Sequence, residues 1–158
     1  MVQAKTNAMR ILDKEKIDYQ FLTYENKDGK IDGISVANKI GKPHELVFKT
    51  LVTIGKANSI HVFVIPVEAE LDFKKAAKAA AEKKLDMLPV KDIQKWTGYI
   101  RGGCSPVGMK KLYPTYIDSG AEGLEKIIVS GGKIGVQLEM DVDNLVSITR
   151  ASLVDLVQ

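Results

Sequence analysis

The chain has 158 residues, of which 45% are hydrophobic and 27% charged, which is enough for one domain with a proper core. Its single cysteine excludes an internal disulfide framework and a structural zinc site built from several thiolates. The formal net charge of +3 permits a nucleic acid partner without demanding one. Because the chain has no apolar run of about 18 residues and no secretory signal, we expect a cytoplasmic protein without a membrane span.

The first half of the chain predicts two short helices and a long β-hairpin. In chain order we expect a helix capped by Thr6 that fades near Lys16, a strand at 19–24, a polar loop at 26–33, a short helix at 35–40 ended by Gly41, and hairpin strands at 47–54 and 60–67. The hairpin strands are almost continuously apolar. This pattern predicts central strands that are buried on both faces.

The second half predicts shorter elements around a glycine-rich loop. We expect a helix at 73–84 capped by Asp72, a short strand at 87–89, a helical turn at 91–96, the loop at 98–108, strands at 115–118, 127–130 and 136–140, and a C-terminal segment from 141 whose first part is helical. The strand spacing is too irregular for a doubly wound sheet. We therefore predict one α/β (α+β) domain over residues 1–158, with a mixed, partly closed barrel-like sheet surrounded by helices.

The common catalytic motifs are missing from this sequence. His44 and His61 have no partner at ligand spacing, so we expect no metal site. The segment 103–108 is one residue too long for a serine-hydrolase elbow, and Pro106 would lack the N–H that such an elbow uses. Cys104 has no obvious activating base, so we interpret it as a packing residue.

Lys49 and two glycine pairs remain as candidates for binding. Lys49 interrupts an apolar run, which indicates either a lysine in a solvated cleft or an edge-strand lysine that blocks aggregation. The pairs at 102–103 and 131–132 are either tight turns or places where a ligand approaches bare backbone N–H groups. Neither pair has the spacing of a nucleotide-binding motif.

An ordered set of motifs gives the chain a family resemblance. The set consists of residues 47–51, 66–78, 97–106, 110–118 and 129–133, together with Tyr24 in an early strand. Over essentially the whole chain, this set resembles the YbaK/EbsC family. The Gly-Gly-x-Ser-Pro segment followed by Lys-Lys is similar to the YbaK branch rather than to the branch that edits alanyl-tRNA(Pro).

The resemblance implies a freestanding editing enzyme that hydrolyses cysteine mischarged on tRNA(Pro), homologous to the editing domain of some prolyl-tRNA synthetases. It also implies a mixed α/β fold with a barrel-like sheet and no metal or cofactor. The residues it assigns are Lys49, Tyr24 and Gly103 for catalysis, and Gly102, Ser105, Pro106, Ser130, Gly131, Gly132 and Gln137 for substrate binding. At position 137 close relatives often carry an aspartate, and glutamine keeps hydrogen bonding there but not charge.

The mechanism implied by the family needs little chemistry from the protein. The substrate's own thiol attacks its ester carbonyl, while Lys49 supplies positive charge to a phosphate or ribose oxygen. Backbone N–H groups near Gly102 and Gly103 would line the ester, and Tyr24 would orient the α-amino group or the leaving ribose hydroxyl. A small pocket would exclude larger side chains. We expect the protein to read the acceptor end and to leave the choice of tRNA to a partner such as prolyl-tRNA synthetase.

Three alternatives stay open on the sequence. The enzyme could also accept Cys-tRNA(Cys), or it could deacylate another small amino acid, such as alanine on tRNA(Pro). From a different class, the chain could be a tRNA- or synthetase-binding module without catalysis.

Overall fold

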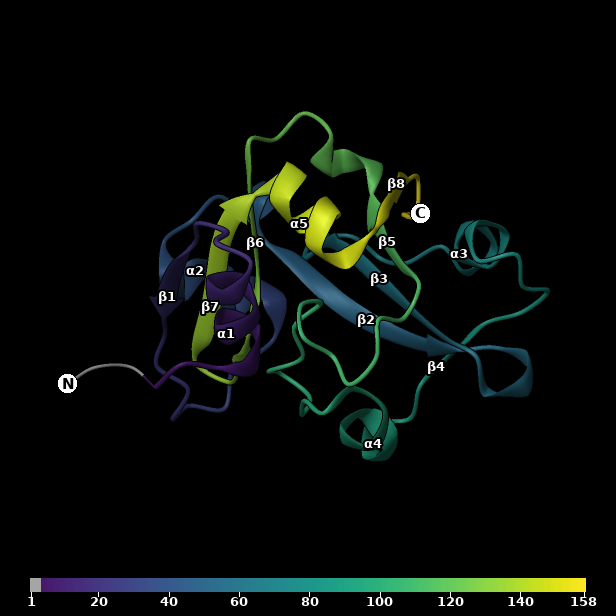
Figure 1. Ribbon diagram of the computed structural model, residues 1–158, viewed down its shortest axis with the longest axis horizontal. Helices are drawn as coiled ribbons and strands as arrows, with labels where there is room; N and C mark the ends of the chain where they lie inside the picture. The colour runs from purple at the N-terminus through teal and green to yellow at the C-terminus, as the bar shows by residue number, and fades with distance from the viewer. Residues whose placement is uncertain (1–3) are drawn as a thin grey trace.

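The structure is a computed structural model that describes residues 4–158, and in this range two β-sheets and five α-helices are formed (Figure 1). A three-stranded antiparallel sheet has the order β1 (Gln20–Thr23), β7 (Val136–Asp141), β6 (Lys126–Lys133). A five-stranded sheet has the order β4 (Asp86–Met87), β2 (Phe48–Ile54), β3 (Ile60–Pro66), β5 (Thr115–Asp118), β8 (Ser152–Val154). The second sheet is mixed, because β5 runs parallel to both β3 and β8.

The helices surround these sheets. They are α1 (Asn7–Lys14), α2 (Gly33–Ile40), α3 (Phe73–Ala79), α4 (Ile93–Thr97) and α5 (Val142–Thr149). Short 3-10 turns occur at His44–Leu46, Lys56–Asn58, Val90–Asp92 and Ser119–Ala121. In the described range no helix is long and apolar enough to cross a membrane.

The predicted mixed α/β fold is confirmed, but the two sheets do not close into a barrel. They are joined by one parallel bridge, between Val47 at the start of β2 and Ile128 in β6. The predicted hairpin is also confirmed, since β2 and β3 pair along their whole length. In Figure 1 this hairpin runs from the middle of the molecule away from the three-stranded sheet.

The two hairpin strands differ in burial, which the sequence did not predict. Residues 60–65 of β3 are all buried, as expected for a central strand. In β2, however, Lys49, Thr50 and Leu51 are only partly buried. The reason is that β4 pairs with β2 only at Thr53 and Ile54, so the first half of β2 keeps an open edge. This open edge positions the candidate site.

Helix α3 ends at Ala79, so the prediction of a helix to residue 84 was too long. The chain leaves the helix because Ala81 adopts a φ of +56°. Glu82 N–H then donates to the Ala77 carbonyl at 2.9 Å, and Ala81 N–H to the Lys78 carbonyl at 3.2 Å, which closes the helix end. The alanine- and lysine-rich sequence continues to favour a helix, but this left-handed residue stops it.

Of the two interpretations of the pair Gly131–Gly132, the tight turn is wrong. Both glycines lie inside β6, where the pairing with β7 is irregular between Ser130 and Lys133. Gly132 has a φ of +95°, a conformation that glycine adopts without strain. The chain reverses at Gly135 instead, where φ is +96°.

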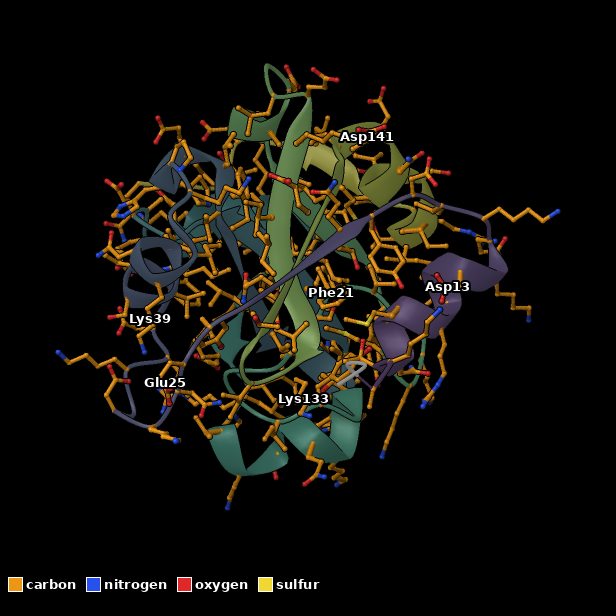
Figure 2. All side chains as sticks on the ribbon, turned by 90° about the vertical axis from the view of Figure 1, so that its left-hand side faces the viewer. Asp13, Phe21, Glu25, Lys39, Lys133 and Asp141 are labelled. Carbon is orange, nitrogen blue, oxygen red and sulfur yellow. The ribbon has the colours of Figure 1, made fainter. Side chains whose placement is uncertain are left out.

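The main core fills one face of the three-stranded sheet. There, α1 and α5 pack on the buried residues of β6 and β7. The opposite face carries a smaller cluster in which Ile128 meets Ala37 of α2 and Val47 and Val67 of the hairpin. Figure 2 shows this arrangement, with Asp13 of α1 and Lys39 of α2 on either side of the sheet. The face toward α2 is the one that contributes to the candidate site.

Candidate active site

A small cavity of about 140 Å³ lies at the open edge of β2. It is bounded by four parts of the fold: the start of the hairpin, α2 with the loop before it, the glycine-rich loop, and the paired strands β6 and β7. The lining residues are Ile31, Gly33, Val36, Val47, Phe48, Lys49, Thr50, Val67, Gly102, Cys104, Ser130 and Gln137. Four residues that the sequence assigned to the site therefore meet here: Lys49, Gly102, Ser130 and Gln137.

The edge of β2 brings its backbone to the cavity. In an antiparallel pair, residues that bond to the partner strand alternate with residues whose N–H and C=O groups point away. The Val67 N–H donates to the Val47 carbonyl at 2.9 Å, which sets this alternation for β2. The backbone groups of Phe48 and Thr50 therefore point away from β3, toward the open edge.

The side chains of Lys49 and Thr50 leave the strand on opposite faces, because successive strand residues alternate. Lys49 projects on the face that carries α2, and Thr50 on the face covered by the glycine-rich loop. Since the cavity lies at the edge between these faces, both residues line it. This geometry explains how two neighbouring strand residues reach one small space.

Ser130 and Gln137 come from the three-stranded sheet. They are directly paired across β6 and β7, and they lie on the same face as Ile128, which packs toward α2. Gln137 is buried, with 6% of its surface exposed. The Ser130 hydroxyl accepts from the Gly132 N–H at 3.4 Å. These two residues supply neutral polar groups to the cavity.

The glycine-rich loop closes the cavity through Gly102. Its φ is +86°, and a Cβ added there would lie 2.7 Å from Ile31 Cδ1. Gly103 is also closely packed, here against backbone that cannot easily move, because an added Cβ would lie 2.9 Å from the Ile134 nitrogen. Its N–H donates to the Ile100 carbonyl at 3.0 Å, so this donor is already used within the loop. The expectation that the Gly103 N–H lines the ester is therefore not met in this structure.

The other assigned residues lie outside the cavity lining. Ser105 is fully buried, and its hydroxyl accepts from the Val107 N–H at 3.2 Å. Pro106 lines a separate hollow of about 210 Å³ beside α1. Gly131 and Gly132 approach other side chains closely, since added Cβ atoms would lie 2.7 Å from Val136 and 3.0 Å from Tyr99. All four shape the loop and the strand behind the cavity.

Tyr24 directly follows β1, and its N–H donates to the Gly135 carbonyl at 3.0 Å. By strand alternation it shares the α2 side of the sheet with Leu22, whose partner in β7 is Gln137. Its hydroxyl is buried and has no hydrogen-bond partner within residues 4–158. Tyr24 therefore sits near the polar face of the site without lining the cavity itself.

The cavity is positively charged. Lys49 is the one charged residue on its lining within the described chain, and it forms no ion pair with any of residues 4–158. An unpaired cation at a small, partly enclosed space attracts an anionic or oxygen-bearing group. Of its two interpretations, the cleft lysine is thus the one that fits.

Cys104 also lines the cavity, but its environment keeps the thiol protonated. Burial raises its pKa to about 11, so very little thiolate exists at neutral pH. Its neighbours include Val52, Leu88 and Trp96, which are apolar or aromatic. This placement agrees with a packing role. Across residues 4–158, no three His, Cys, Asp or Glu side chains gather closely enough to hold a metal ion.

Two contributions to the cavity could not be predicted from the sequence. One is Thr50, whose position beside Lys49 resembles that of any strand threonine. The other is α2, which brings Gly33 and Val36 to the lining. A Cβ on Gly33 would lie 2.5 Å from Val67 Cγ1, so the glycine allows the helix to approach the hairpin. No motif in the sequence marks this contact, because it depends on the tertiary packing of α2.

Comparison with known sequences gives a consistent match to this geometry. A family model for the aminoacyl-tRNA editing domain matches residues 33–148, which include every cavity residue except Ile31. A protein of Enterococcus faecalis (strain ATCC 700802 / V583), EbsC, bears the name of a candidate Cys-tRNA(Pro)/Cys-tRNA(Cys) deacylase. It is 44% identical to this chain over 154 residues, which cover 98% of this chain and 94% of the relative.

Solved structures share the fold. One, described as a candidate trans-editing enzyme for prolyl tRNA synthetase, matches with a TM-score of 0.84 and 21% identity over 99% of both chains. Another, of a hypothetical protein, matches with a TM-score of 0.87 and 20% identity, covering 96% of this chain and 99% of the other. At these identities the likeness establishes the mixed α/β architecture.

Proposed function

Because this chain belongs to the aminoacyl-tRNA editing domain family, we propose that it is a deacylase that removes cysteine from mischarged tRNA(Pro). The observation that supports this most is the small cavity of about 140 Å³ with Lys49 on its lining. This cavity is small for a ligand site, since such sites commonly measure about 300–1,000 Å³. It therefore suits a small aminoacyl group better than a large one.

The proposed reaction uses the nucleophile of the substrate. The cysteine sulfur forms a bond to the ester carbonyl carbon, and the bond between that carbon and the ribose oxygen breaks. The thiol proton ends on the ribose oxygen, so the products are a cyclic cysteine thiolactone and tRNA with a free 3′ end. An aminoacyl ester is already activated, and folding the thiol toward the carbonyl makes the attack intramolecular.

Lys49 carries the main catalytic role in this proposal. Its ammonium group has no competing carboxylate partner among the described residues, so it can stabilise the developing oxyanion or hold the terminal phosphate. The unpaired Tyr24 hydroxyl would orient the leaving ribose hydroxyl. Gly102, Ser130 and Gln137 would contact the aminoacyl group from the cavity wall.

Other assigned residues would act on the shape of the site. Gly103, Ser105 and Pro106 hold the glycine-rich loop in place, while Gly131 and Gly132 form the irregular part of β6 that carries Ser130 to the cavity. We place the reaction in the cytoplasm and propose prolyl-tRNA synthetase as a partner. The cavity would receive the aminoacyl group at the 3′ end of the tRNA and offers little surface to choose among tRNAs.

The test is a deacylation assay over a panel of charged tRNAs, with and without prolyl-tRNA synthetase. We expect fast release of cysteine from Cys-tRNA(Pro) and much slower release of serine, because a hydroxyl is a weaker nucleophile than a thiol. Recovery of a thiolactone as the first product would support the intramolecular step. Preferred hydrolysis of Ala-tRNA(Pro), or binding of charged tRNA with no ester cleavage, would contradict the proposal.

A further inference from the structure

Thr50 carries a polar atom that the fold leaves unused. Its Oγ1 is buried and has no hydrogen-bond partner within residues 4–158, although the residue lines the cavity. A buried hydroxyl without a partner costs free energy, and most buried polar groups in native proteins are paired. Of the cavity-lining residues in the described chain, Thr50 is the one with such an atom.

The charge of the cavity indicates what this oxygen binds. A cysteinyl ester carries an α-ammonium group, which needs hydrogen-bond acceptors when it leaves water. No aspartate or glutamate lies on the lining within residues 4–158, and position 137 holds a neutral glutamine. The ammonium group must therefore bind neutral oxygen atoms. Thr50, Ser130 and Gln137 supply the neutral side-chain oxygens of the lining, and the Ser130 hydroxyl also accepts from the Gly132 N–H. Of these three residues within the described chain, Thr50 is the one whose oxygen is buried without any partner.

Strand geometry places Thr50 Oγ1 and the Lys49 ammonium group on opposite faces of β2. Lys49 and Thr50 are neighbours on β2, so their side chains leave opposite faces of the strand. An ammonium group at Thr50 lies on the face away from Lys49, which weakens their repulsion, while the ester and ribose oxygens face the lysine. No hydrogen bond within the described chain holds the Thr50 rotamer, so a turn about χ1 to meet a bound ammonium group would break no hydrogen bond.

On the basis of the proposed function, we propose that Thr50 Oγ1 accepts a hydrogen bond from the α-ammonium group of the bound aminoacyl ester. Thr50 is thus a positioning residue that places the cysteinyl group with its carbonyl beside Lys49. It also makes the site selective for esters that carry a free amine.

The test compares Thr50→Val with Thr50→Ser on two substrates: Cys-tRNA(Pro) and 3-mercaptopropionyl-tRNA(Pro), which keeps the thiol but lacks the amine. Valine has the shape of threonine without the hydroxyl, and serine keeps the hydroxyl. We expect Thr50→Val to lower kcat/KM on Cys-tRNA(Pro) about ten- to hundredfold, because losing a hydrogen bond to a charged group weakens binding by about this factor. Thr50→Ser should stay close to wild type. On the substrate without the amine, Thr50→Val should cause no further loss.

Thr53→Val is the matched control on the same strand. The Thr53 hydroxyl is buried and already donates to the His61 carbonyl at 2.9 Å. Its loss should lower Tm and leave kcat/KM unchanged, whereas Thr50→Val should leave Tm unchanged or higher. This opposite pattern distinguishes a residue that binds substrate from one that stabilises the fold.

Two results would overturn the inference while leaving the proposed function intact. One is wild-type deacylation of Cys-tRNA(Pro) by Thr50→Val, and the other is an equal loss on both substrates. If Thr50→Val does not fold, Thr50→Ala with the same pair of substrates gives the same comparison. Failure of the wild-type protein to deacylate Cys-tRNA(Pro) would instead contradict the proposed function itself.

Discussion

The polar groups at the two ends of strand β2 differ in whether they have partners within the fold. At the open edge, Lys49 has no ion-pair partner and the Thr50 hydroxyl has no hydrogen-bond partner within residues 4–158. At the hairpin turn, Glu82 accepts from the Ser59 hydroxyl at 2.5 Å and lies 3.0 Å from His61 Nε2. The Glu82 carboxylate is thus held by partners within the fold, although His61 Nδ1 beside it is buried without one among residues 4–158. At the cavity, Lys49 and the Thr50 hydroxyl are available to a ligand.

The two ends also differ in what the surrounding chain does. At the turn, the end of α3 brings the Glu82 carboxylate so close that a Cβ on Gly55 would lie 2.3 Å from it. At the open edge, β4 stops short and the glycine-rich loop covers the strand only in part. A larger hollow of about 530 Å³ lies beside the turn, and the lysines on its lining are exposed. Partly buried polar groups without partners in the described chain, rather than volume, distinguish the candidate site.

The strongest test of this contrast is Lys49→Ala. In the proposed mechanism Lys49, the one charge on the described lining, stabilises the oxyanion, so we expect its loss to lower kcat/KM on Cys-tRNA(Pro) about a hundred- to thousandfold. Tm should hardly change, because Lys49 forms no ion pair in the described chain. Lys74→Ala, at an exposed lysine on α3, is the control and should keep full activity. Near-normal rates for Lys49→Ala would refute the assigned site.

A smaller effect is expected for Gly102→Ala, which tests the wall of the cavity. The added Cβ would lie 2.7 Å from Ile31 Cδ1 at a φ of +86°, so the loop must shift. We expect a loss of about ten- to hundredfold in kcat/KM, because displaced contacts misalign the ester. The backbone strain alone costs about 1–2 kcal/mol of stability.

Gly41→Ala is the control that separates the effect of backbone strain from the effect of a misaligned cavity wall. Gly41 has a similar φ of +69°, but an added Cβ would meet nothing within 4 Å, and the residue lies at the end of α2 away from the lining. Gly41→Ala should lower Tm about as much as Gly102→Ala does, with no change in activity. Equal losses of activity in both variants would mean that the cavity wall at Gly102 has no special role.

The paired end of β2 predicts an effect on stability alone. The Ser59 hydroxyl, and after it His61, hold the pKa of Glu82 below its ordinary value. A carboxyl group whose folded pKa is lowered stabilises the protein above its unfolded pKa, and this contribution is lost as the pH falls through the folded pKa. Glu82→Gln should therefore lower Tm at neutral pH, and the difference from wild type should shrink below about pH 4.

Thermal unfolding across pH 3–7, with a deacylation assay at neutral pH, measures both sides of this prediction. The variant should keep wild-type kcat/KM, because Glu82 lies at the far end of the hairpin from the cavity. A Tm difference that is constant with pH would show that the carboxylate contributes nothing to the stability of the turn.

The same contrast explains which parts of the molecule could be predicted from the sequence. The hairpin and the starts of α1 and α3 follow from local patterns, since β-branched runs favour strands and Thr6 and Asp72 favour helix starts. Lys49 stood out because a charge in an apolar run conflicts with its surroundings. Local patterns do not fix the end of α3, where a left-handed alanine and tertiary contacts of Glu82 prevail over helix propensity.

Thr50 could not be predicted as part of the site, because its role depends on a missing partner rather than on its own chemistry. Thr53, three residues along the strand, has the same side chain, but its hydroxyl is paired. Ser105 shows the reverse case. The glycine-serine-proline motif assigned it to substrate binding, yet its hydroxyl accepts from the Val107 N–H and is fully buried. Motif position indicates that a residue matters, and only the hydrogen-bond partners indicate how.

The smallest effect is expected for Cys104→Ser. Cys104 lies on the lining of the same cavity as Lys49, so its position alone fits a nucleophile. Burial, however, raises its pKa to about 11, which leaves almost no thiolate at neutral pH. A neutral thiol attacks an ester poorly, so the substrate thiol remains the better nucleophile, and we expect kcat/KM for Cys-tRNA(Pro) within about threefold of wild type. Mass spectrometry of quenched reactions should find no acyl group on the protein. Complete loss of activity in Cys104→Ser, with an acylated Cys104 in the wild type, would move the attacking sulfur from the substrate to the protein.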